Sequence, residues 1–270
     1  MSETVSEREA APRGKRLRWQ TIAEYVIVVA IILESIFFAA YAPQFLSVPN
    51  LVNIALSIAI TGILAVGMTA VILTGGIDLS VGSVAALAGV VAAMIAASDF
   101  AGSVALASLA ALGVGLAVGI FNGVMVAWFR VPPFVTTLAM LTICRGLAFV
   151  LTGGRAVGNL PAGFGLFGRE HLLGVPVPVI LMLLVFAAGW FVLRRMTFGR
   201  YVYAVGGTSL NGGRGSVIAT LWGAVFIGVL NNGLNLAGID PYMQRIALGA
   251  VILLAVLADQ INKSRGQLSA

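Results

Sequence analysis

The stretch that decides the fold is Leu73-Thr74-Gly75-Gly76-Ile77-Asp78-Leu79-Ser80-Val81-Gly82-Ser83, which lies between two apolar runs long enough to cross a bilayer. It places two adjacent glycines, a carboxylate and hydroxyl groups at membrane depth. Polar groups and irregular backbone are tolerated there only where protein or a water-filled cavity covers them. Helices broken in this way commonly mark the translocation path of a transporter. The stretch is therefore either part of such a path or a tight turn in which Asp78 or Ser80 caps the following helix.

The composition indicates that lipid is the solvent of this chain. Hydrophobic residues make up 60% of the 270 residues and charged residues only 10%, whereas soluble domains carry about 25% charged residues. The apolar runs have helix length, and no alternating ten-residue segments occur, which favours a helical bundle over a barrel. We expect an all-α, polytopic membrane protein of about eight transmembrane helices with broken or re-entrant elements.

Eight apolar runs are the candidate spans. They lie at about Ile22–Tyr41, Leu51–Leu73, Val81–Ala97, Ser103–Phe129, Phe134–Thr152, Val177–Leu193, Ser216–Leu236 and Tyr242–Ala258. The fifth opens on Pro132-Pro133, where a missing N–H costs nothing. We expect residues 1–20 and 263–270 to form cytoplasmic tails, with one transmembrane domain over residues 21–262.

The basic residues are distributed unevenly over this topology. Twelve of the sixteen fall on the side of the two termini, Arg155, Arg169 and Arg245 fall on the opposite side, and Arg145 lies within a span. This is the positive-inside pattern, and it predicts that both termini are cytoplasmic. The net charge of +6 therefore indicates membrane orientation rather than binding to nucleic acid.

The residue counts argue against several chemistries. The single cysteine, Cys144, and the single histidine, His171, allow neither an internal disulfide nor a Cys/His metal cluster. No Gly-x-x-x-x-Gly-Lys-[Ser/Thr] motif is present, so the chain cannot hold nucleotide phosphates in a P-loop. No Ser/His/Asp arrangement or paired carboxylate set suggests catalysis. We therefore expect no enzyme activity, no catalytic residue and no cofactor or metal.

Arg145 is the most costly residue within a predicted span. An arginine at the centre of a membrane helix costs about 2.5–3.5 kcal/mol on insertion scales, so it should face the bundle interior or water. Glu34 and Asp78 are its possible ion-pair partners. Direct contact with a translocated ligand is the alternative.

Asn122 lies in a span that also carries a stripe of small residues. Gly115, Gly119 and Gly123 are spaced four residues apart, which predicts close approach of a neighbouring helix. A buried amide beside such a stripe needs hydrogen-bond partners.

Further polar residues lie in the fifth and seventh spans. Asn231, Asn232 and Asn235 cluster near the end of the seventh, and they are either contacts between helices or hydroxyl-binding groups for a neutral polar solute. Thr136 and Thr137 follow the proline pair, and a hydrogen bond to a helix carbonyl is the default expectation for them.

The broken stretch has a partial repeat late in the chain. Gly75–Gly82 and Gly206–Gly213 share the pattern Gly-Gly-x-[Asp/Ser]-Leu-[Ser/Asn]-x-Gly. Matching polar breaks in two halves are typical of transporters built from structural repeats.

These motifs resemble those of bacterial ATP-binding cassette permeases for ribose-, xylose- and arabinose-type monosaccharides. Besides Ile72–Ser83, the resemblance rests on Val66–Thr69, Phe121-Asn122-Gly123, Phe134–Leu138, Arg145-Gly146, Phe198–Tyr201, Gly206–Leu210 and Asn231–Leu236, which follow one another in the family's order.

The resemblance implies a permease subunit for a monosaccharide in the bacterial inner membrane. The implied partners are a cytoplasmic ATP-binding subunit, a periplasmic sugar-binding protein and a second permease copy, besides membrane lipid. The residues expected along the substrate path or its gate are Thr74, Gly75, Gly76, Asp78, Ser80, Asn122, Thr136, Thr137, Arg145, Asn232 and Asn235. Those expected on the side of the ATPase are Arg194, Arg195, Gly199 and Arg200.

One departure from the family pattern lies at Gly206-Gly207. The family's segment continues there into a stretch that contacts the ATPase and into about two further spans, whereas here Gly206-Gly207 joins directly to Thr208-Ser209-Leu210. We expect an internal deletion of roughly sixty residues with its junction at residues 206–208. The alternatives are therefore a truncated permease without transport activity, inert or an assembly partner, and an ion-coupled secondary transporter that uses Glu34, Asp78 and Arg145.

Overall fold

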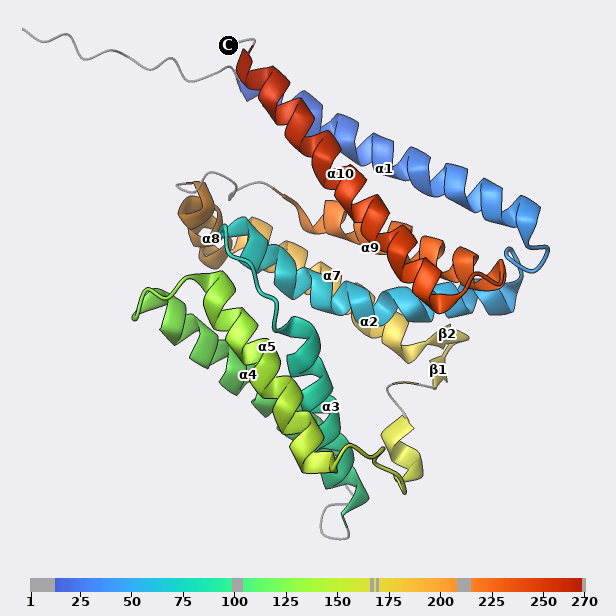
Figure 1. Cartoon of the computed structure of the whole chain (residues 1–270), viewed down its shortest axis with the longest axis vertical. Coiled ribbons are helices and arrows are strands. Elements are labelled where there is room, and N and C mark those ends of the chain that lie inside the picture. Colours follow the sequence, from blue (N-terminus) through green and yellow to red (C-terminus); the bar gives the residue numbers. More distant parts are fainter. Residues whose placement is uncertain (1–12, 99–103, 166–167, 169, 208–214, 269–270) are drawn as a thin grey trace, which may run out of the picture. The chain divides into compact units, whose positions relative to one another are not determined.

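The computed structural model describes residues 13–98, 104–165, 168, 170–207 and 215–268, and most of them are helical (Figure 1). The elements in chain order are α1 (Arg13–Tyr41), α2 (Val48–Leu73), α3 (Val81–Ala97), α4 (Val104–Ala127), α5 (Pro133–Thr152), η1 (Ala162–Gly165), β1 (His171–Leu172), β2 (Val175–Pro176), α7 (Val177–Arg195), α8 (Thr197–Gly207), α9 (Val217–Leu236) and α10 (Pro241–Leu268).

The helices confirm the predicted class and the positions of the apolar runs. Five of them, α2, α4, α5, α7 and α9, are long and apolar enough to cross a membrane. Shorter apolar helical stretches lie at Tyr25–Tyr41, Val81–Ala97 and Pro241–Leu257. Together they occupy the eight predicted positions, so the chain is an all-α, multi-pass membrane protein.

Two elements of the structure are absent from the prediction. α8 is a helix of 11 residues, too short to cross a bilayer. The long connection after α5 also carries a two-stranded antiparallel hairpin, in which His171 pairs with Pro176 and Leu172 with Val175.

Proline and glycine set the ends of α5. Pro132 occupies the N-cap position and Pro133 opens the helix, as predicted, because the first turn needs no N–H from proline. At the other end Gly153 adopts the left-handed conformation with φ 59°, which costs glycine little.

The chain divides into two compact units. The first unit contains the described residues up to Ile54 and those from Trp222 onwards, and the second contains Ala55–Leu221. In the first unit the Phe38 ring packs against Phe45, with 5.8 Å between the ring centroids. A Cβ atom at Gly233 of α9 would overlap the Phe38 ring. α1 and α9 therefore pack closely only because residue 233 has no side chain.

In the second unit α3 packs against both α4 and α5, and the three helices run alongside one another (Figure 1). Two small buried clusters join them, one of Leu87, Met140 and Cys144 and one of Ala92, Ala96 and Ala107. α2 packs against α7 in the same unit, where a Cβ atom at Gly189 would overlap the Val66 side chain.

The glycine stripe of α4 has no neighbour in the described part of the chain. A Cβ atom at Gly115, Gly119 or Gly123 would meet nothing within 4 Å. The close helix approach predicted from this spacing is therefore not made by any described helix of this chain.

Candidate functional site

The site begins where the backbone between α2 and α3 leaves the helical conformation. Gly75 has φ 83°, in the left-handed region where a side chain is strained. The N–H groups of Gly75 and Gly76 donate to the carbonyls of Ile72 (2.9 Å) and Val71 (3.1 Å), so the end of α2 remains hydrogen-bonded. The Thr74 hydroxyl adds a bond of 2.7 Å to the Val71 carbonyl.

Asp78 and Ser80 fix the entry to α3. One carboxylate oxygen of Asp78 accepts from both the backbone N–H of Ser80 (2.7 Å) and its hydroxyl (2.6 Å). Ser80 occupies the N-cap position of α3 and is only 1% exposed, but its side chain does not bond to the helix backbone. The carboxylate therefore orders the turn, and the serine hydroxyl stays available for another contact.

Two neighbouring helices hold this turn in place. The side-chain amide of Asn122 in α4 donates to the Ser80 hydroxyl at 3.2 Å. The Thr137 hydroxyl of α5 lies 3.1 Å from the Ile77 carbonyl and 2.9 Å from the Pro133 carbonyl of its own helix. The second of these contacts is the helix-carbonyl bond expected of Thr137. Predicted residues from three segments thus meet at one place.

Two buried side-chain atoms of α4 and α5 lack a partner among the described residues. They are the carbonyl oxygen of the Asn122 amide and the hydroxyl oxygen of Thr136, and both are buried. Asn122 is 9% exposed and Thr136 6%. An unsatisfied buried polar group costs about 1–3 kcal/mol. The turn at Asp78–Ser80, Asn122 and these threonines is called the α3 entry site below, and it contains two buried polar atoms that have no described partner.

Asn232 lies in the first unit and forms a different kind of contact. Its side-chain amide and that of Asn50, in the first turn of α2, donate to each other at 2.9 Å in both directions. Asn50 also donates to the Phe45 carbonyl at 2.8 Å. This reciprocal pair favours the helix-contact interpretation for Asn232, whereas Asn235 is exposed.

Arg145 lies past the middle of α5, and its side chain is exposed. No acidic group of the described part of its own unit forms an ion pair with it. Asp78, one of the two predicted partners, is bonded to Ser80 instead. Both carboxylate oxygens of Glu34, the other predicted partner, are buried without a hydrogen-bond partner among the described residues.

The sequence reasoning missed three polar residues that the structure brings into contacts. Thr69 of α2 and Thr220 of α9 share a hydrogen bond of 2.7 Å within the second unit, and Asn50 pairs with Asn232. These partners are separated by 151 and 182 residues, and only the buried polar character of Asn50 and Thr69 within apolar runs could have marked them.

The residues predicted for the ATPase side surround the junction of α7 and α8. Arg194 and Arg195 lie in the last turn of α7, where basic groups interact favourably with the helix dipole. A Cβ atom at Gly199 would overlap the Leu193 carbonyl. Gly199 therefore allows α8 to fold back closely against the end of α7, and Arg200 follows it in α8.

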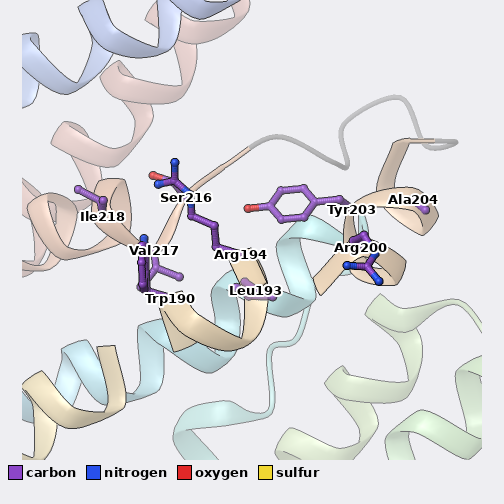
Figure 2. Close-up of a pocket in the computed structure, with 9 residues that line it drawn as sticks. All are labelled: Trp190, Leu193, Arg194, Arg200, Tyr203, Ala204, Ser216, Val217 and Ile218. Atoms are coloured by element: carbon purple, nitrogen blue, oxygen red, sulfur yellow. The ribbon is translucent and has the colours of Figure 1, made fainter. Parts of the chain in front are cut away.

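A cavity of about 710 Å³ lies beside this junction (Figure 2). Its lining includes Trp190, Arg194, Arg200 and Tyr203. The Tyr203 hydroxyl donates to the Gly215 carbonyl at 3.2 Å. Burial raises the pKa of the Tyr203 phenol above its usual value, and the nearby Arg194 guanidinium offsets only part of this rise. The cavity is called the α7–α8 pocket below.

No group of three or more His, Cys, Asp or Glu side chains that could hold a metal ion occurs among the residues that the structure describes. The α3 entry site combines one carboxylate, which is engaged with Ser80, with neutral amide and hydroxyl groups.

Comparison with known proteins identifies the relatives of this chain. The family described as "Branched-chain amino acid transport system / permease component" matches residues 50–209. The ribose import permease RbsC of Escherichia coli K12 is 36% identical over 324 residues, covering 96% of this chain and 98% of that protein. RbsC of Bacillus subtilis is 34% identical over 81% of this chain and 87% of its own length. The D-allose permease AlsC of Escherichia coli K12 is 28% identical over 94% of this chain and 95% of its own length. No solved structure matches.

The length of one of these alignments bears on the junction expected at residues 206–208. The alignment with the Escherichia coli RbsC is 324 positions long and therefore exceeds the 270 residues of this chain by 54. At least that many residues of the relative have no counterpart here. The family match also ends at residue 209.

Proposed function

We propose, from the premise that this chain belongs to the permease family of ATP-binding cassette sugar importers, that it carries a monosaccharide of the pentose or hexose class across the bacterial inner membrane. The nearly full-length similarity to two ribose import permeases and a D-allose permease supports this substrate class. Within this proposal the permease moves the sugar by alternating access, and ATP is hydrolysed by a partner chain.

The observation that carries the proposal is the α3 entry site. A sugar presents neutral hydroxyl groups, and each can both donate and accept a hydrogen bond. The free carbonyl oxygen of Asn122 accepts, and the free hydroxyl of Thr136 can do either. Asp78 is engaged with Ser80, so we assign it the role of ordering the break rather than of contacting the sugar.

We propose partners from the same premise. A cytoplasmic ATP-binding subunit would dock at the α7–α8 junction through the side that carries Arg195, beside the pocket that Arg194 and Arg200 line. A periplasmic sugar-binding protein would deliver the sugar on the opposite side, and a second copy would complete the membrane assembly. The distribution of basic residues supports cytoplasmic termini.

Uptake assays test the proposal directly. The chain is co-expressed with the ATP-binding and sugar-binding proteins of its locus in a host that lacks ribose, xylose and arabinose import. Uptake of each radiolabelled sugar is then measured with and without ATP depletion. We expect ATP-dependent uptake of at least one sugar. The proposal fails if no pentose or hexose enters and the chain never co-purifies with a P-loop ATPase.

A second candidate is a shortened permease without transport activity. The 54 or more unmatched positions of the RbsC relative motivate it. The retention of the α3 entry site and the nearly full-length similarity to the relatives do not favour it. ATPase activity stimulated by a sugar-loaded binding protein in reconstituted vesicles would exclude this candidate.

A further inference from the structure

The segment around the α7–α8 pocket carries positive charge that the neighbouring sequence does not balance. No acidic residue occurs between Glu170 and Asp240, whereas the same segment contains Arg194, Arg195, Arg200 and Arg214. None of the described arginines among them forms an ion pair within the described residues. A ligand or surface that neutralises this segment must therefore be anionic.

The pocket combines these cations with an apolar wall. The Arg194 guanidinium carbon lies 5.7 Å from the centre of the Trp190 ring, within the range of a cation–π contact. Leu193, Val217 and Ile218 provide the apolar part of the lining. Figure 2 shows the Tyr203 hydroxyl pointing toward the Arg194 side chain. A ligand that fits this lining has a charged end and an apolar end.

α8 carries the features of a helix at a membrane interface. It buries Val202, Gly199 and Gly206 and exposes Phe198 and Tyr201. A short amphipathic helix with exposed aromatic side chains and a basic residue suits the plane of the lipid headgroups. With both termini cytoplasmic, as the distribution of basic residues predicts, the end of α7 and its pocket would lie near the cytoplasmic surface of the membrane.

We propose that the α7–α8 pocket binds the phosphate headgroup of an anionic phospholipid. Arg194 and Arg200 contact the phosphate, and Trp190 and Ile218 cover the upper part of an acyl chain. Basic pockets beside membrane helices on the cytoplasmic side are suited to such headgroups. The bound lipid would hold α8 against α7 and leave Arg195, which does not line the pocket, to other partners. The inference uses the cytoplasmic orientation but not the transport activity.

Lipid binding to the detergent-purified full chain tests the proposal. Native mass spectrometry is used to measure the affinities for phosphatidylglycerol and for phosphatidylcholine with the same acyl chains. The proteins compared are the wild type, Arg194→Ala, Arg200→Ala and the double variant. Arg195→Ala is the matched control, because it removes an exposed arginine adjacent to Arg194 that lies outside the pocket.

We expect preferential binding of phosphatidylglycerol by the wild type and by Arg195→Ala. Each pocket substitution should weaken it by about fivefold and the double variant by about twenty-fivefold, the effect of one surface cation per substitution. Arg194→Lys with Arg200→Lys keeps the charge and should retain most of the binding. This variant provides the comparison if the alanine variants do not fold.

Four outcomes would overturn the proposal, the last of them a result with the ATPase. The first is equal binding of the two lipids, and the second is a loss for Arg195→Ala as large as for the pocket variants. The third is equally tight binding of glycerol phosphate without acyl chains, which would assign the pocket to a free phosphate. If the pocket variants bind lipid normally but lose co-purification of the ATPase, the arginines contact that protein instead. Failure of sugar uptake together with failure to co-purify an ATPase would overturn the proposed function and leave the lipid proposal standing.

Discussion

The side-chain amide of Asn122 donates to the Ser80 hydroxyl at 3.2 Å, and that hydroxyl donates in turn to Asp78 at 2.6 Å. A residue near the C-terminal end of α4 is thereby connected to the carboxylate that orders the break before α3. The donors point in one direction, from the Asn122 amide through the Ser80 hydroxyl to the Asp78 carboxylate, so removal of Ser80 or Asp78 leaves a donor without its acceptor.

Replacement of Asn122 by alanine tests this chain. The variant loses the bond to Ser80, and we expect it to cost about 1–2 kcal/mol of stability, measured as a lower melting temperature in detergent. Sugar uptake should fall as well, because the free carbonyl oxygen of the amide is lost. Asn235→Ala is the stability control, since Asn235 is exposed, and it should change stability by less than about 0.5 kcal/mol. Equal stability losses in the two variants would contradict the role assigned to Asn122.

The left-handed conformation of Gly75 gives a second prediction. Because φ is 83°, Gly75→Ala should destabilise the protein by about 1–2 kcal/mol. Gly75→Asn should cost less, because asparagine tolerates positive φ better. Gly67→Ala in α2 provides the control, since a Cβ atom there meets nothing within 4 Å. A melting temperature that falls equally for the asparagine and alanine variants would argue against a backbone cause.

Close packing of Phe38 on Gly233 gives a third prediction. Gly233→Ala should cost about 1–3 kcal/mol through overpacking, measured by thermal unfolding in detergent. Addition of Phe38→Leu should recover part of this loss in a double-mutant cycle. The control is Gly223→Ala in the same helix, where a Cβ atom finds open space and the higher helix propensity of alanine favours folding. Additive effects of the two substitutions would show that the ring does not limit residue 233.

The exposed Arg145 gives a fourth prediction, which rests on the proposed transport function. Arg145→Leu should change the melting temperature little, by the equivalent of less than about 0.5 kcal/mol, because the arginine has no ion pair in its own unit. Uptake should fall by about tenfold, as expected for the loss of one contact of about 1.4 kcal/mol along the path. A large loss of stability with unchanged uptake per folded molecule would instead indicate a structural ion pair.

The sequence predicted those parts of the fold and site that depend on local chemistry. Apolar runs located the helices, because only a helix satisfies its backbone in lipid. The glycine pair located the break, because Gly75 needs a positive φ. Asp78 and Ser80 were recognised because short polar side chains at or just before the N-cap of a helix commonly order its first turn.

Contacts between distant segments could not be predicted in this way. Asn50 and Asn232 are 182 residues apart, and neither has a local pattern that specifies the other. α8 was missed because its 11 residues fall below the length of a span and its register only becomes evident when it lies against α7. The spacing of Gly115 and Gly119 predicted a close neighbouring helix that the described residues do not supply. Such spacing shows that a helix can approach closely, but it does not show which helix does so.

The reciprocal amide pair of Asn50 and Asn232 also constrains how the molecule is made. Both residues belong to the first unit, which is assembled from the two ends of the chain, while the second unit comes from the middle. During synthesis, α2 enters the bilayer long before α9 has left the ribosome. Until α9 is inserted, the Asn50 amide can therefore bond only to the Phe45 carbonyl or to temporary partners. The packing of the first unit is completed last.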